Sequence, residues 1–173
     1  MMKNLELTLA IIKPHLVKNP VALNAVRKKI LDANFKVVKS KRRKLTLDNA
    51  EIFYQEHANK FFYNRLVTSM TSGPSETYVL ARENAIQHWR QLMGPTKVYK
   101  AQFDQPYSIR GQFGLSDTRN AAHGADSPKS VEREIGILFP EFNIDMWFNN
   151  DRKYYENDDL VFDDENFVHR VIH

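Results

Sequence analysis

Runs of apolar residues and their alternation with charged ones predict four strands. The segment Leu5–Ile12 is apolar at nearly every position, which is typical of a strand buried on both faces, and Lys13 and Pro14 end it. The second expected strand covers residues 35–45, where lysines and arginines follow two valines and give the strand a charged face. The other two expected strands cover residues 76–82 and 121–123.

Helical spacing of apolar side chains, together with capping residues, predicts the connecting elements. Helices are expected over about residues 20–33, 60–71, 84–93 and 128–139, with one more after Asp48. Asp48 is a residue type that caps helices. Ser127 as N-cap and Pro128 at the first helical position begin the last helix, and Pro140 ends it.

The order of these elements predicts the fold class. Two βαβ-like units with antiparallel pairing indicate a ferredoxin-like α/β sandwich, βαββαβ, with an antiparallel four-stranded sheet. Residues 94–124 interrupt this order with four of the six glycines and little periodicity. A long irregular loop inside a compact domain is usually functional, so the chemistry is expected there.

Composition and charge limit the class of protein. The chain has 173 residues, 42% hydrophobic content and no cysteine, which suits one domain without disulfides or thiolate metal sites. Its apolar runs fall short of the roughly 20 residues that a membrane helix needs. We see no signal or transit segment at the N-terminus, so we expect a cytoplasmic protein, with a mitochondrial location as the second option.

The net charge of +4 is unevenly distributed. From Asn149 onward there are seven acidic and three basic residues, so the preceding part carries +8. We therefore expect a domain over residues 1–148 and an acidic C-terminal tail over residues 149–173. A basic body favours anionic partners such as nucleotides or nucleic acid, and ordinary solubility charge explains it equally well.

Phosphate-binding side chains gather in and beside the irregular loop. They are Arg90, Thr96, Lys97, Lys100, Arg110, Arg119 and Asn120, together with His123. Guanidinium groups bind phosphate oxygens in pairs, and histidine offers a neutral nucleophilic nitrogen near pH 7. Glu134 follows in the next helix and can hold the other ring nitrogen, while Lys13 ends a strand at the sheet edge where ligands bind. From spacing alone, solvated surface cations are the commoner explanation.

Five segments resemble nucleoside diphosphate kinases, in the order of that family and over about residues 5–148. They are TLAIIKP, FYQEHANKFFYNRLVTSMTSGP, WRQLMGPT, SIRGQFG and RNAAHGADS. The strings GPTKVYKAQFDQP and GLSDTRN are most similar to the divergent type-6 branch. The resemblance implies that a γ-phosphoryl group passes from a nucleoside triphosphate such as ATP to a nucleoside diphosphate through a phosphohistidine at His123.

The resemblance also assigns roles to residues. It makes His123 the nucleophile, Glu134 the carboxylate that orients it, and Lys13 and Tyr54 their catalytic neighbours. The nucleotide-binding residues that it implies are Lys13, Phe62, Leu66, Arg90, Thr96, Arg110 and Asn120. Phe62 would stack on the base, which suits many nucleotides because every base has a π-face. Core packing is the competing explanation for Phe62 and Tyr54. Mg²⁺ would be held mainly by the nucleotide, so no all-protein metal site is expected.

Four features depart from the family pattern. His15 replaces an aspartate where the first helix opens, so we expect a lost cap. Ala125 replaces a serine whose hydroxyl assists at the phosphate site, so we expect slower transfer. Asp117 stands where many members place an apolar residue against the base. The loop over residues 96–108, which makes trimer contacts in the hexamers of the family, is longer here; a homo-oligomer stays an option, with the usual hexamer in question.

Two other functions fit the sequence. The first is a weakly active or inactive pseudo-kinase that binds nucleotide and serves as a subunit for a protein partner, which Ala125 and the acidic tail favour. The second is an RNA-binding ferredoxin-like module, which the basic run over residues 39–44 favours. A solvated edge strand is the commoner explanation of that run, so nucleic acid is the less favoured partner, and no membrane association is expected.

Overall fold

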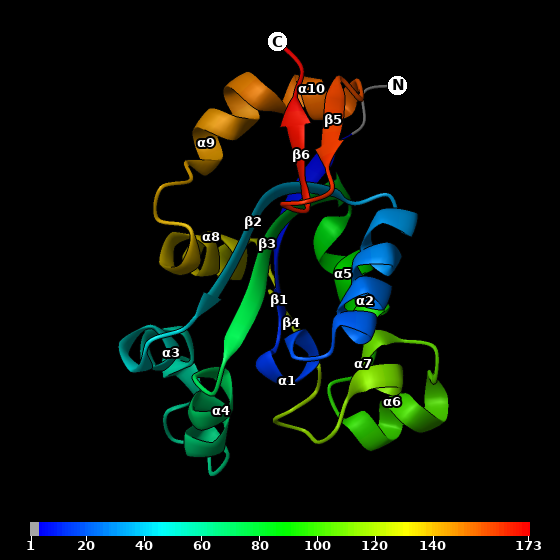
Figure 1. The fold of residues 1–173 in the computed structure, drawn as a ribbon. Coiled ribbons are helices and arrows are strands. Elements are labelled where there is room, and N and C mark those ends of the chain that lie inside the picture. Colours follow the sequence, from blue (N-terminus) through cyan, green and yellow to red (C-terminus); the bar gives the residue numbers. More distant parts are fainter. Residues whose placement is uncertain (1–3) are drawn as a thin grey trace.

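A four-stranded antiparallel sheet forms the centre of the computed structural model, which describes residues 4–173 (Figure 1). Its strands, in the order β2-β3-β1-β4, are β2 (Lys36–Lys44), β3 (Pro74–Glu83), β1 (Leu5–Ile12) and β4 (Ala122–Gly124). This is the predicted antiparallel α+β sandwich, and the prediction is confirmed. The sequence analysis expected no signal or transit segment at the N-terminus. Residues 1–3, on which that expectation partly rests, lie outside the described residues.

Both faces of the sheet are buried, which is why β1 is apolar at nearly every position. Leu9 and Ile11 join the core beneath one helical layer, which consists of α3 (Leu47–Phe53), α4 (Tyr63–Met70) and α8 (Pro128–Leu138). Ala10 and Ile12 join the opposite core. Its helices are α1 (Pro14–Val17), α2 (Pro20–Asp32), α5 (Ala85–Met93) and α7 (Ile109–Phe113).

The helix caps agree with the sequence in one case and differ in another. Ser127 caps α8 as predicted, because its Oγ accepts a hydrogen bond from the amide of Ser130 at 3.2 Å. The prediction for Asp48 is wrong: Thr46 caps α3 by accepting from the amide of Asn49 at 3.1 Å. Asp48 lies in the first turn, where its charge still favours the helix dipole.

The loop over residues 94–124 is more regular than its sequence indicates. It contains α6 (Val98–Asp104) and α7, so the expectation of an irregular segment is wrong. A further short helix, η1 (Gln55–His57), precedes α4. None of the helices within residues 4–173 combines the length and the apolar character needed to cross a bilayer.

The chain after α8, which includes the acidic tail over residues 149–173, lies at the top of the sheet in Figure 1. Its elements are α9 (Ile144–Met146), η2 (Trp147–Asp151), α10 (Arg152–Glu156), β5 (Leu160–Asp163) and β6 (Val168–Val171). Tyr155 and Phe167 are buried in the two cores. His169 accepts a hydrogen bond on Nδ1 from the amide of Val37 in β2, at 2.9 Å. The domain boundary at residue 148 stays a prediction.

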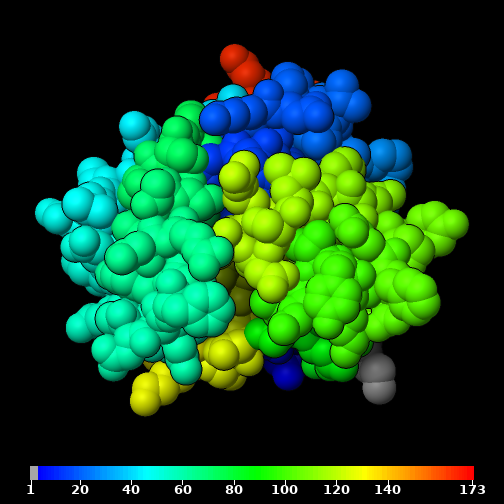
Figure 2. Space-filling model, turned by 90° about the horizontal axis from the view of Figure 1, so that it is seen from below, coloured from blue at the N-terminus to red at the C-terminus, as the bar shows by residue number. Residues whose placement is uncertain are grey.

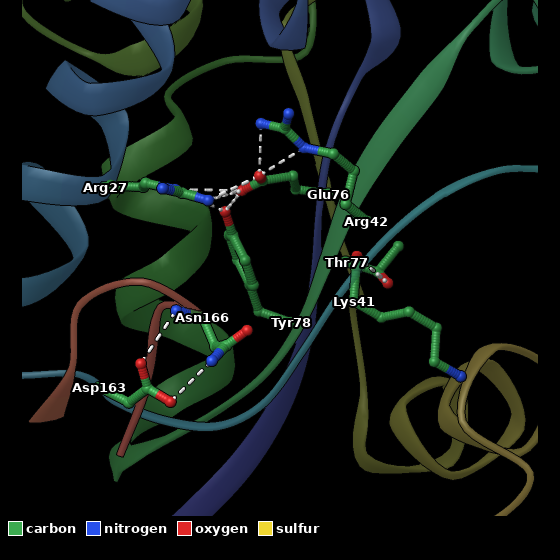
Figure 3. Close-up of polar contacts among 8 residues, drawn as sticks. All are labelled: Arg27, Lys41, Arg42, Glu76, Thr77, Tyr78, Asp163 and Asn166. Carbon is green, nitrogen blue, oxygen red and sulfur yellow. Dashed lines mark hydrogen bonds and ion pairs between the residues drawn. The ribbon is translucent and has the colours of Figure 1, made fainter. Parts of the chain in front are cut away.

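The basic run on β2 makes contacts within the chain. Lys41 lies 3.2 Å from the carboxylate of Glu141, and Arg43 donates to the carbonyl of Leu138 at 3.1 Å. Glu76 on β3, only 2% exposed, binds both Arg27 at 2.6 Å and Arg42 at 2.8 Å. Figure 3 shows these two guanidinium groups converging on Glu76, with the Tyr78 hydroxyl beside it.

Candidate active site

A cavity of about 810 Å³ opens between the α3–α4 segment and the loop that contains α6. Figure 2 views this face, with the α3–α4 segment in teal and the loop in green to yellow. The ten predicted site residues all line the cavity: Lys13, Tyr54, Phe62, Leu66, Arg90, Thr96, Arg110, Asn120, His123 and Glu134. The structure therefore brings together residues that are spread over 122 positions of the chain.

His123 lies in the middle of β4, opposite Ile11 of β1. Its Nε2 is hydrogen-bonded to Oε1 of Glu134, and its backbone carbonyl accepts from the indole N–H of Trp89 at 3.0 Å. The bond to a carboxylate favours the tautomer with the proton on Nε2, which leaves the lone pair on Nδ1. A Cβ on Gly124 would lie 2.4 Å from Cδ1 of Trp89, so glycine allows the indole to pack beside the histidine.

Two buried cations lie beside the histidine. Lys13 is only 4% exposed, and its ammonium donates to the carbonyl of Thr118 at 3.3 Å. Burial, and then the charge of Arg110, lower the pKa of Lys13 to about 7. Arg110 donates to the carbonyls of Gly94 at 2.8 Å and Ala122 at 3.0 Å. Burial, and then the charge of Arg90, lower its pKa to about 10. An anionic ligand would relieve this crowding of positive charge.

Tyr54 is a buried neighbour of His123. The rings of Tyr54 and His123 lie edge to face with centroids 6.4 Å apart, and Tyr54 is 4% exposed. Burial, and then the charge of Glu134, raise the pKa of the phenol, so it stays protonated. Among the described residues, neither the Tyr54 hydroxyl nor Oε2 of Glu134 has a hydrogen-bond partner, although both atoms are buried.

The outer part of the cavity is aromatic. The Phe62 ring lies 5.6 Å from the ring of His57 and 5.5 Å from that of Phe61. Phe62 also packs against the core, so the core-packing explanation applies, and its role in stacking on a base stays a prediction. Leu66 lies one helical turn further along α4. Aromatic rings and cations that line one cavity suit a ligand with a flat ring and a charged tail.

Some lining residues escaped the sequence analysis. They are Glu56, His57, Arg65, Asp126 and Ser130. Arg65 follows Phe62 by three positions, and helical spacing places such residues on one face. Conversely, Lys100 and Arg119 do not line this cavity and are exposed, so their inclusion among the phosphate-binding groups is wrong. Lys97 does line it.

The departures from the family pattern occupy defined places. His15 lies in the first turn of α1, whose N-cap, Lys13, makes no capping bond through its side chain. Burial lowers the pKa of His15 to about 4, so it is neutral. Asp117 lines the cavity, and its Oδ1 accepts from the amide of Val98 at 3.3 Å, at the first residue of α6.

Known proteins of one family match this chain. The family model for nucleoside diphosphate kinase matches residues 6–144. Nucleoside diphosphate kinase 6 of Xenopus tropicalis is 47% identical over 167 residues, which cover 96% of this chain and 93% of that protein. The protein of the same name from Danio rerio is 44% identical over 171 residues, covering 99% and 97%.

Solved structures agree. The nucleoside diphosphate kinase of Aquifex aeolicus matches with a TM-score of 0.75 at 36% identity, over 78% of this chain and 95% of that one. The enzyme of Halobacterium salinarum, solved in complex with CDP, matches with a TM-score of 0.72 at 32% identity, over 78% and 87%.

Proposed function

This chain belongs to the nucleoside diphosphate kinase family, and we propose that it is an active member. It transfers the γ-phosphoryl group of a nucleoside triphosphate such as ATP to a nucleoside diphosphate, through a phosphohistidine at His123. The observation that carries this proposal is the contact between Nε2 of His123 and Glu134, inside a cavity that is lined by cations and by aromatic rings. Nδ1 is then the nucleophilic nitrogen.

Each half-reaction moves one phosphoryl group. The Nδ1 lone pair attacks the γ-phosphorus, the bond to the β-phosphate oxygen breaks, and the nucleoside diphosphate leaves. Glu134 stabilises the positive charge that the ring acquires, because its Oε1 accepts the hydrogen bond that Nε2–H donates. In the second half, a terminal phosphate oxygen of the acceptor diphosphate attacks the phosphohistidine, and the P–N bond breaks.

The cavity supplies binding groups for each part of a nucleotide. Lys13, Arg90 and Arg110 would hold the phosphates and offset charge on the transferring group, which is the main source of catalysis in phosphoryl transfer. Thr96 and Asn120 would hold the sugar or the phosphates. Phe62 would stack on the base, with Leu66 beside it.

Enzymes of the family generally use Mg²⁺ with their nucleotides. Within residues 4–173, no group of three or more His, Asp or Glu side chains could hold a metal ion. Lys13, Arg90 and Arg110 are cations that fit phosphate rather than a metal ion. Mg²⁺ would therefore arrive with the nucleotide, where it neutralises phosphate charge.

The test is phosphoenzyme formation. Purified protein is incubated with γ-labelled ATP and Mg²⁺, and then chased with GDP. We expect acid-labile label on the parent, its release as GTP, and no label on His123→Ala. His173→Ala, which changes an exposed histidine at the other end of the molecule, is the matched control and should label normally.

The pseudo-kinase is the second candidate, and the alanine at position 125 favours it. ATP binding without label on the parent would support this reading instead. Label that forms but does not leave with GDP would indicate a defect confined to the acceptor step. Against the RNA-binding module, Lys41, Arg42 and Arg43 of β2 already bind Glu141, Glu76 and the carbonyl of Leu138.

A further inference from the structure

Two buried polar atoms near the nucleophile lack partners that they need. Oε2 of Glu134 is buried, and the hydroxyl of Tyr54 is buried as well, without a hydrogen bond to any described residue. A buried acceptor or donor left unpaired costs about 1–3 kcal/mol, and more for a charged group, so each such atom calls for an explanation.

The two atoms complement one another. An ionised carboxylate only accepts hydrogen bonds, and a protonated phenol can donate one. Both groups contact the same imidazole: Glu134 is bonded to its Nε2, and the Tyr54 ring lies edge-on to it at 6.4 Å. Both also line the same cavity.

Position 125 supplies no hydrogen-bond donor to this part of the cavity. Ala125 is 1% exposed and belongs to the same buried cluster as Tyr54. Its methyl group cannot donate a hydrogen bond. A serine there, two residues from His123, would add a hydroxyl to the cavity that Tyr54 and Glu134 also line.

We propose that Tyr54 is a positioning residue whose hydroxyl is linked to Oε2 of Glu134 through one buried water, in place of the donor missing at position 125. The role rests on the proposed function, because Tyr54 acts through Glu134 on His123. With both oxygens bonded, Glu134 keeps the orientation in which it accepts from Nε2. With Oε2 free, the carboxylate can rotate and the imidazole loses its alignment for attack.

The proposal predicts a selective kinetic defect. Tyr54→Phe keeps the ring and removes the hydroxyl, so the rate of His123 phosphorylation by ATP should fall roughly tenfold or more, as misalignment of a reacting group does. The KM for ATP should change little, because Tyr54 holds the carboxylate rather than the nucleotide. Tyr63→Phe, on a half-buried tyrosine of α4 that does not line the cavity, is the matched control and should behave like the parent.

Rescue separates positioning from general structural damage. Ala125→Ser adds a hydroxyl to the cavity, so it should raise the rate more in the Tyr54→Phe protein than in the parent. Equal gains in both backgrounds, or no loss in Tyr54→Phe, would overturn the proposal. A loss in Tyr54→Phe that comes with weaker ATP binding and is not rescued would assign Tyr54 a structural role instead.

A second readout keeps this proposal separate from the proposed function. The proton on Nε2 of His123 is observable by NMR when its bond to Glu134 slows exchange with water. We expect faster exchange in Tyr54→Phe and slower exchange again after Ala125→Ser, whether or not the protein transfers phosphate. If the parent forms no phosphoenzyme but the exchange follows this pattern, the kinase proposal fails and the Tyr54 proposal stands. An unchanged signal in Tyr54→Phe refutes the role of Tyr54.

Discussion

Lys13 has a lowered pKa because its ammonium is buried beside another cation. Its ammonium is buried next to Arg110, and these two causes bring its pKa from 10.5 down to about 7. Between these values the unfolded chain holds a proton that the folded chain has released. Stability therefore rises with pH over this window as far as Lys13 is concerned, and the buried charge is a cost at lower pH.

Bound phosphate should raise the pKa of Lys13 again, which predicts that nucleotide binding depends on pH. A bound polyphosphate favours the charged ammonium, so binding takes up a proton above pH 7. We expect the Kd for ADP to rise above pH 7 by up to about tenfold per unit, the limit for one linked proton. Calorimetry in two buffers with different ionisation enthalpies measures the proton uptake. Lys13→Met should bind more weakly at pH 7 with a flatter profile, and a flat profile in the parent would contradict the idea.

The ten site residues were predictable from the sequence because the family pattern places each of them in a recognisable segment. The groups that hydrogen-bond to these residues were not predictable. The carbonyls of Gly94 and Ala122 that hold Arg110, and the indole N–H on the His123 carbonyl, depend on the chain path rather than on residue type. His57 carries no local signal for the cavity, since a polar residue on a helix is usually solvated, and for Arg65 only the spacing from Phe62 indicates it.

Among the elements, length decided what could be predicted. Leu5–Ile12 and α8 have an apolar run or a cap that defines them. Helices α6 and α7 have seven and five residues, too few to repeat a helical period convincingly. Thr46 and Asp48 are both capping types two positions apart, and only the backbone shows which one begins α3.

Helix α6 depends on a residue from outside it. Lys97 makes no capping bond through its side chain, and the first amide of the helix donates to Asp117 instead. Asp117→Ala should therefore lower the free energy of unfolding by about 1 kcal/mol, the usual value of a cap. Urea denaturation measures this change. Asp104→Ala, at the exposed C-terminal end of α6, should cost less; an equal loss would rule out capping by Asp117.

On the scale of the whole molecule, the C-terminal hairpin is part of the core. Phe167 is 2% exposed, lies 5.2 Å from the ring of Tyr78, and has the Arg27 guanidinium 4.8 Å above it. Figure 3 shows Arg27 and Tyr78 meeting at Glu76 on the same face of the sheet. The sequence indicated only an acidic tail here, because its strands have four residues each, too few to show a clear alternation of apolar and polar positions.

Removing the Phe167 ring should destabilise the entire domain. Phe167→Ala is expected to cost about 3 kcal/mol in the free energy of unfolding, as large-to-small core substitutions do. Ile172→Ala, 57% exposed near the same end of the chain, is the control and should change little. Equilibrium unfolding in urea, followed by circular dichroism, compares them. Equal stability of Phe167→Ala and the parent would show that the hairpin contributes nothing to the core.

The indole that supports the nucleophile also has an optical consequence. The chain has two tryptophans, and Trp89 donates directly to the carbonyl of His123. Its emission therefore senses the field at that carbonyl, which changes when the neighbouring imidazole gains a phosphoryl group. With Trp147 replaced by phenylalanine, the fluorescence of the remaining indole reports the time course of each half-reaction without a label. A stopped-flow instrument can follow it within a single turnover.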